Sequence, residues 1–161
     1  RFVSNLGVRF AFTFIDAISR GTGLSHGQLG IIYALRDVSG VGAPAVGKIT
    51  QRSGTVRVMG IGTAIATTSY LVATSGATGF AIGMIASGIG KLTFDVGMNT
   101  WVGDVVAYER RARASGLVEM MWALAALVGL PLSGVLIDQF GWQAAPALLG
   151  LLGIAPMIAI N

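Results

Sequence analysis

The sequence predicts an all-α polytopic membrane protein, a single bundle of six transmembrane helices. Only 11% of its 161 residues are charged, whereas soluble domains average about 25%. Glycine is abundant, with 24 residues, and this is typical of membrane helices that pack by close approach of their backbones. The chain also divides into six apolar segments, each near the roughly 20 residues that span a bilayer core.

Short polar stretches separate the six segments, and all of these connections are too short to hold a soluble domain. The 4 prolines lie inside the segments, where the neighbouring helices of a membrane bundle support an interrupted hydrogen-bond ladder. We therefore expect one bundle domain over residues 1–161, with approximate helices at 2–19, 27–49, 56–73, 78–102, 115–137 and 142–160.

Basic residues predict the orientation of the bundle. Arg20 is the only one in the connections of one side, and seven lie in or beside the connections of the other. The positive-inside rule then places both termini in the cytoplasm, for a protein of the inner or plasma membrane. The seven residues are Arg1, Lys48, Arg52, Arg57, Arg110, Arg111 and Arg113.

Several function classes find no support in the sequence. The net charge of +4 comes from residues that flank the membrane, so no nucleic-acid partner is expected. The single histidine, His26, lies in a connection beside Ser25, with no set of residues around it that resembles a catalytic centre. Cysteine is absent, which excludes disulfides and thiolate metal sites. We expect no enzymatic activity, no metal and no cofactor.

Ionisable and polar residues within the apolar segments point to a wet interior. A charged side chain that faced lipid at mid-depth would cost about 3 kcal/mol, so these residues are expected to face protein or water. Because they fall in the first, second, fourth and fifth segments, we expect those four helices to surround a cavity and the third and sixth to be peripheral. The candidate cavity residues are Arg9, Asp16, Arg36, Asp37, Lys91, Asp95, Asn99 and Glu119.

Helical spacing arranges these residues in stripes. Lys91, Asp95 and Asn99 follow one another at intervals of four, which places them on one helix face. A longer stripe in the first segment contains Asn5, Arg9, Thr13, Asp16 and Arg20. The alternative is that these residues form ion pairs that lock helices together without binding a solute. For Glu119, near the start of its helix, a position at the membrane interface is favoured.

Three motifs resemble the major facilitator superfamily. The stretch "GKITQRSGTVR" resembles the family's loop between helices two and three, with Gln51 where the family usually has Asp; its matching residues are Gly47, Arg52, Gly54 and Arg57. The stretch "GDVVAYERRARASG" resembles the loop between helices four and five, through Asp104, Glu109, Arg111, Arg113 and Gly116. The stretch "GLPLSGVLIDQFGW" resembles the end of helix five in drug and sugar efflux antiporters, through Gly129, Pro131 and Gly134.

The resemblance implies the amino-terminal six-helix half of a twelve-helix secondary transporter. In that family the two halves rock about a midplane site, so the expected partners are a small-molecule substrate, protons, the lipid bilayer and a second six-helix half, in the same full-length chain or a separate copy. We expect proton-coupled export by an antiporter, because protonation of carboxylates at depth removes the cost of burying their charge. Two alternatives stay open: proton-coupled uptake of an organic anion or zwitterion, favoured by Arg9, Arg36 and Lys91, and a non-transporting structural or assembly subunit.

Overall fold

The computed structural model describes the backbone of residues 1–160 and the side chains of residues 1–158. Helices make up nearly all of this part of the chain, and it contains no strand, so the all-α prediction is confirmed there. The elements are α1 (Phe2–Thr13), α2 (Ile15–Thr22), α3 (His26–Val38), the 3-10 turn η1 (Ser39–Gly42), α4 (Ala43–Ser53), α5 (Thr55–Val72), α6 (Ala77–Val105), α7 (Tyr108–Leu124), the π-helical turn η2 (Ala125–Gly129), α8 (Leu130–Phe140) and α9 (Ala144–Ile160).

Three helical stretches of the described chain are long and apolar enough to cross a membrane: His26–Ser53, Ala77–Val105 and Tyr108–Phe140. The bent pair α1 and α2 makes a fourth if it counts as one span. Length and composition therefore support three or four clear spans and not the predicted six. The helix α5 is 18 residues long but contains four threonines, a serine and an arginine, and the apolar helix at Ala144–Ile158 is shorter than a full span.

Three of the apolar stretches are interrupted. The axes of α1 and α2 differ by 76°, so the expected single helix over residues 2–19 is two helices. The turns η1 and η2 each precede a proline, Pro44 near the start of α4 and Pro131 near the start of α8. A proline has no N–H and clashes with the carbonyl four residues earlier, and those carbonyls belong to Gly40 in η1 and Leu127 in η2.

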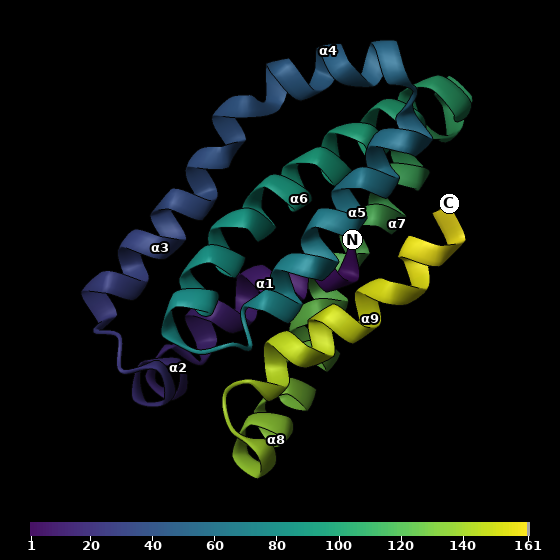
Figure 1. The fold of residues 1–161 in the computed structure, drawn as a ribbon. Coiled ribbons are helices and arrows are strands. Elements are labelled where there is room, and N and C mark those ends of the chain that lie inside the picture. Colours follow the sequence, from purple (N-terminus) through teal and green to yellow (C-terminus); the bar gives the residue numbers. More distant parts are fainter. Residues whose placement is uncertain (161) are drawn as a thin grey trace.

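The helices α5 and α6 form the closest pair in the bundle. Glycines recur every seven residues along α6, at Gly83, Gly90 and Gly97, and so share one helix face. A Cβ atom added to Gly90 would lie 2.6 Å from the backbone nitrogen of Ala66 on α5. In Figure 1, α3 lies on one flank of this pair and α9 on the other, and the contacts of α3 with α6 and of α9 with α5 agree.

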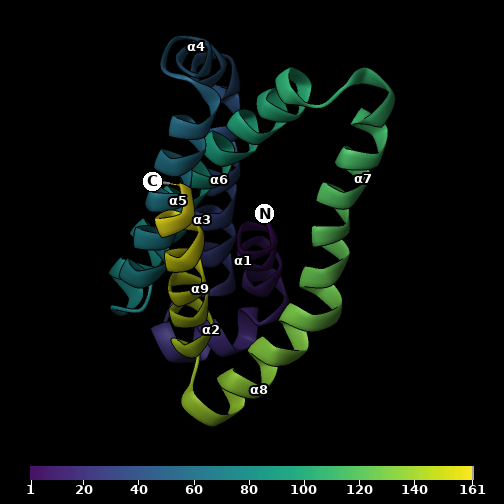
Figure 2. The same ribbon diagram turned by 90° about the vertical axis from the view of Figure 1, so that its right-hand side faces the viewer.

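The segment formed by α7, η2 and α8 lies on the far side of α1, as Figure 2 shows. None of the residues of α7 is buried, whereas η2 is anchored to α1 because a Cβ atom on its Gly129 would lie 2.7 Å from the Leu6 side chain. The buried core that joins the helices includes Phe10, Phe80 and Trp142. The first helix, α1, therefore lies between the layer formed by α3, α6, α5 and α9 and the long α7–α8 segment.

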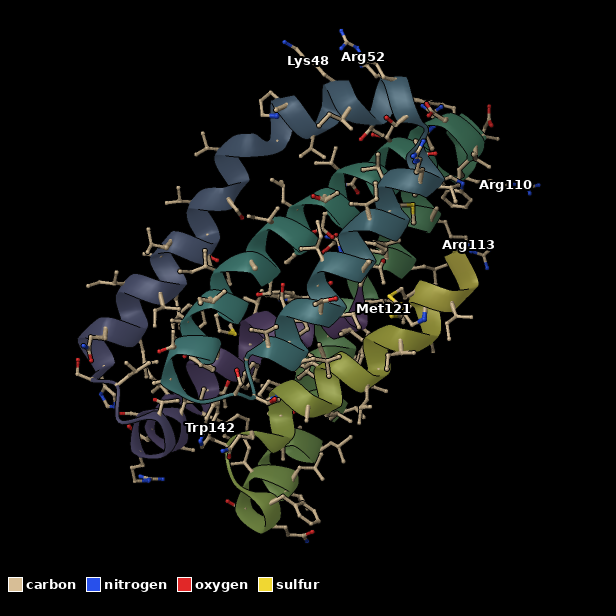
Figure 3. The ribbon with its side chains drawn as sticks, viewed as in Figure 1. Lys48, Arg52, Arg110, Arg113, Met121 and Trp142 are labelled. Carbon is tan, nitrogen blue, oxygen red and sulfur yellow. The ribbon has the colours of Figure 1, made fainter. Side chains whose placement is uncertain are left out.

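The basic connections gather at one end of the bundle. Lys48 and Arg52 project from α4, and Arg110 and Arg113 project from the beginning of α7, near the same end (Figure 3). Trp142 lies toward the opposite end, at the turn between α8 and α9. The connections after α4 and before α7 must lie on the same side of the membrane if successive spans alternate in direction, and they do lie at the same end of the bundle. That the basic end faces the cytoplasm remains a prediction from the positive-inside rule.

Candidate functional site

A cavity of about 400 Å³ lies between α1, α3, α6 and α7. Its wall contains four of the predicted site residues, Arg36, Asp37, Lys91 and Asp95. These four come from α3 and α6, which belong to the second and fourth apolar segments. No group of three or more His, Asp or Glu side chains that could hold a metal ion occurs in the described part of the chain.

The helix α5 also reaches this cavity, through Tyr70. The expectation that the third apolar segment is peripheral is therefore wrong at this residue. Gly7 on α1 makes room for the phenol ring, because a Cβ atom there would lie 1.9 Å from the Tyr70 hydroxyl oxygen. The sequence holds no local signal for this contact, since it joins two residues on separate helices.

Lys91 and Asp95 form an ion pair on the α6 side of the cavity. Lys91 Nζ donates to Asp95 Oδ2, as residues four apart on a helix can do. Both side chains are largely buried, with exposed fractions of 25% and 20%. The other carboxylate oxygen of Asp95, Oδ1, is buried and accepts no hydrogen bond from the described residues.

Arg1 connects this pair to α7. Its Nη1 atom lies 3.8 Å from Asp95 Oδ1, and its Nη2 atom donates to Glu119 Oε1 at 2.8 Å. Charges of alternating sign thus run from Lys91 through Asp95 and Arg1 to Glu119, whose side chain is 64% exposed. The charge count placed Arg1 at the membrane flank, but Figure 2 shows the amino end beside α7, partway along the bundle. The position of Arg1 in the sequence therefore did not predict how deep in the bundle its side chain lies.

Arg36 on α3 is almost completely buried, with 3% of its surface exposed. Its Nε donates to Asp37 Oδ1 at 2.9 Å, and its guanidinium carbon lies 5.5 Å from the ring centres of both Phe12 and Tyr33. The terminal nitrogens Nη1 and Nη2 are buried and have no hydrogen-bond partner among the described residues. Gly88 allows α6 to approach here, because a Cβ atom on it would lie 2.3 Å from the Arg36 carbonyl oxygen.

A family model for the Major Facilitator Superfamily matches residues 1–160. The chain belongs to the Major Facilitator Superfamily. Members of this superfamily are integral membrane transporters and not enzymes, so the protein is assigned to the membrane transporters, in agreement with the expected class.

The other predicted site residues of this Major Facilitator Superfamily chain lie outside the cavity wall. The Arg9 guanidinium stacks on Trp122 with 4.2 Å between its carbon and the ring centre, which joins α1 to α7. Asp16 is 71% exposed and pairs with His26 Nε2 at 3.0 Å. The predicted stripe from Asn5 to Arg20 is not one helix face, because α2 is bent away from α1. Asn99 is exposed on α6.

The loop motifs of the superfamily occupy the ends of helices. Gly54 links α4 to α5 with φ of 88°, a conformation that a side chain would strain. Arg111 donates from Nε to the Val106 carbonyl at 3.0 Å and from Nη2 to the Gly103 carbonyl at 2.6 Å, so it closes the end of α6. Arg52, Arg57 and Asp104 lie near these helix ends. The other motif residues lie elsewhere: Gly47 within α4, Arg113 in α7, Gly129 at the end of η2, and Pro131 and Gly134 in α8. Their conformational role stays a prediction.

Proposed function

We propose that this chain is the transport half of a proton-coupled transporter, which moves a small organic solute through the cavity by alternating access. The observation that supports it best is the Lys91–Asp95 pair on the cavity wall, with Arg1 facing the second oxygen of Asp95. Ionisable residues inside a membrane bundle are costly and usually belong to a substrate or proton pathway. A cavity of about 400 Å³ also lies within the usual size range of small-molecule sites.

The coupling mechanism follows from competition for Lys91. In the empty cavity, the ammonium group balances the charge of Asp95. A solute that draws Lys91 away leaves the carboxylate with Arg1 alone, and Glu119 already holds the Nη2 atom of Arg1. Loss of a nearby opposite charge favours the neutral, protonated form of a carboxylate. Solute and proton occupancy are then linked, and the coupling acts equally in both directions.

Export is the first direction to test, because residues 129–142 resemble the helix-five motif of drug and sugar antiporters. The second candidate is uptake of an organic anion or zwitterion, which is favoured by Arg36 and Lys91 on the cavity wall. Uptake of fluorescent drugs into inverted vesicles under a pH gradient, compared with uptake of labelled organic acids into cells, separates these candidates. Absence of both fluxes would favour a non-transporting subunit.

The role of Asp95 is tested with Asp95→Asn in the full-length transporter, reconstituted in proteoliposomes with the solute found in that comparison. We expect the variant to insert normally and to exchange solute, but to lose accumulation driven by the pH gradient. Asp138→Asn, which removes an exposed carboxylate at the end of α8, is the matched control and should retain both activities. Intact gradient-driven accumulation in Asp95→Asn would exclude this residue as the coupling site.

A further inference from the structure

Arg36 has hydrogen-bonding capacity that the protein leaves unused. Of its guanidinium nitrogens, Nε is held by Asp37, whereas Nη1 and Nη2 are buried without a partner among the described residues. A buried charge with unsatisfied donors is strongly unfavourable unless other interactions offset it. The residue lines the cavity beside Lys91 and Ser87, so a molecule in the cavity is the partner that could complete its hydrogen bonds.

From this geometry we infer that Arg36 forms an anion subsite, and that the transported solute is a small organic anion with a carboxylate or phosphate head group. The inference rests on the proposed function in taking the cavity as the solute site. The two terminal nitrogens of a guanidinium form a planar fork that matches two oxygens of such a head group. Asp37 accepts a hydrogen bond from Nε, whereas Nη1 and Nη2 have no acceptor among the described residues and can donate to the solute.

The neighbours of Arg36 do not supply an alternative acceptor. Phe12 and Tyr33 meet the guanidinium through their rings, and such contacts attract a cation without accepting its in-plane hydrogen bonds. The Asp37 side chain is 62% exposed and contacts only Nε. Asp95, the other carboxylate on the wall, is already paired with Lys91. Asp37 balances the charge of Arg36, but Nη1 and Nη2 still lack acceptors among the described residues.

The remaining wall indicates the body of the solute. Val8, Leu92 and Trp122 line the cavity with apolar surface, which favours an apolar or aromatic group behind the anionic head. Benzoate and phenyl phosphate carry the two head groups on the same ring, and benzamide is their neutral counterpart. These three probes separate the charge of the head from the size and shape of the ring, and the two anions distinguish carboxylate from phosphate.

The test measures binding of the three probes to the purified full-length transporter by calorimetry. At least one anion should bind more tightly than benzamide. Arg36→Lys keeps the charge but removes the fork, so it should weaken that binding roughly tenfold to a hundredfold. Arg110→Lys, at an exposed position on α7 that points away from the bundle in Figure 3, is the matched control and should bind as the wild type does.

Two results would overturn the subsite. One is that neither anion binds the wild-type protein more tightly than benzamide does; the other is that both anions bind Arg36→Lys as tightly as they bind the wild type. The first comparison needs no variant, so it decides the question even if the substitution prevents folding. Accumulation of a neutral or cationic solute under a pH gradient, without anion binding, would overturn the subsite and leave the proposed function standing. Anion binding that depends on Arg36, without any gradient-driven transport, would support the subsite and contradict the proposed coupling.

Discussion

At the scale of single residues, Arg111 shows how a loop motif holds a helix end. The last carbonyls of a helix lack intrahelical partners; Arg111 donates to that of Gly103, in the last turn of α6, and to that of Val106, the residue directly after the helix. Its positive charge also complements the negative end of the helix dipole. The side chain is exposed, so the expected contribution of these contacts to stability is small, about 1 kcal/mol.

We therefore predict that Arg111→Ala lowers the free energy of unfolding in detergent by about 1 kcal/mol. Arg111→Lys should lose less, because it keeps the charge near the helix end. The measurement is the unfolding transition of the purified transporter in increasing denaturant. Arg110→Ala, at the exposed neighbouring position, is the control and should leave the transition unchanged. Equal effects at the two positions would contradict the assigned contacts.

Residue contacts within a helix could be predicted from the sequence, and those between helices could not. The spacing of Lys91 and Asp95 predicted one shared face, and the two side chains are in contact. The contacts of Arg1 with Asp95 and of Arg9 with Trp122 join distant parts of the chain, so no local pattern contains them. Asp16 fitted the predicted stripe in α1 but belongs to another helix, because the chain bends between them.

At the scale of elements, small residues determine how closely α5 and α6 pack. A Cβ atom on Gly62 of α5 would lie 2.4 Å from the backbone nitrogen of Phe94, and one on Gly90 of α6 would lie 2.6 Å from that of Ala66. Backbone atoms cannot move aside as a flexible side chain can. Because lipid provides no hydrophobic drive for helix association, such close packing is a main source of bundle stability.

Gly90→Ala should therefore destabilise the bundle by about 1 to 3 kcal/mol, the usual cost of an overpacked interior. Gly103→Ala is the matched control on the same helix, because a Cβ atom there meets nothing within 4 Å, and alanine is the better helix former. Melting temperatures in detergent would compare the two variants. A Gly90→Ala protein as stable as Gly103→Ala would show that α5 and α6 can separate without cost.

The helices themselves were more predictable than their interruptions. Low charge and long apolar runs predicted an all-α chain, and proline chemistry explains why η1 and η2 lie just before Pro44 and Pro131. No proline lies in the first segment, so nothing local marked the 76° bend between α1 and α2. The count of six spans was too high because α5 is rich in hydroxyl side chains and the apolar helix at Ala144–Ile158 is shorter than a full span.

At the scale of the whole molecule, alternating access requires two distinct ends and a cavity between them. Ser53 lies at the end of α4, and Ser75 lies in the turn between α5 and α6 at the other end of α5. The chain contains no cysteine, so cysteines placed at these two serines report one position each. In a cysteine-free full-length protein, Ser53→Cys should react with an impermeant maleimide from the cytoplasmic side and Ser75→Cys from the opposite side.

The same assay tests the central claim, that the cavity opens alternately to the two sides of the membrane. Ser39 in η1 lines the cavity and is partly exposed, so Ser39→Cys is placed where the solute is proposed to bind. We predict that Ser39→Cys reacts in right-side-out and in inverted vesicles, and that a pH gradient changes the ratio of the two rates, while Ser53→Cys and Ser75→Cys each react from one side only. Reaction of Ser39→Cys from a single side, with and without the gradient, would contradict alternating access through this cavity.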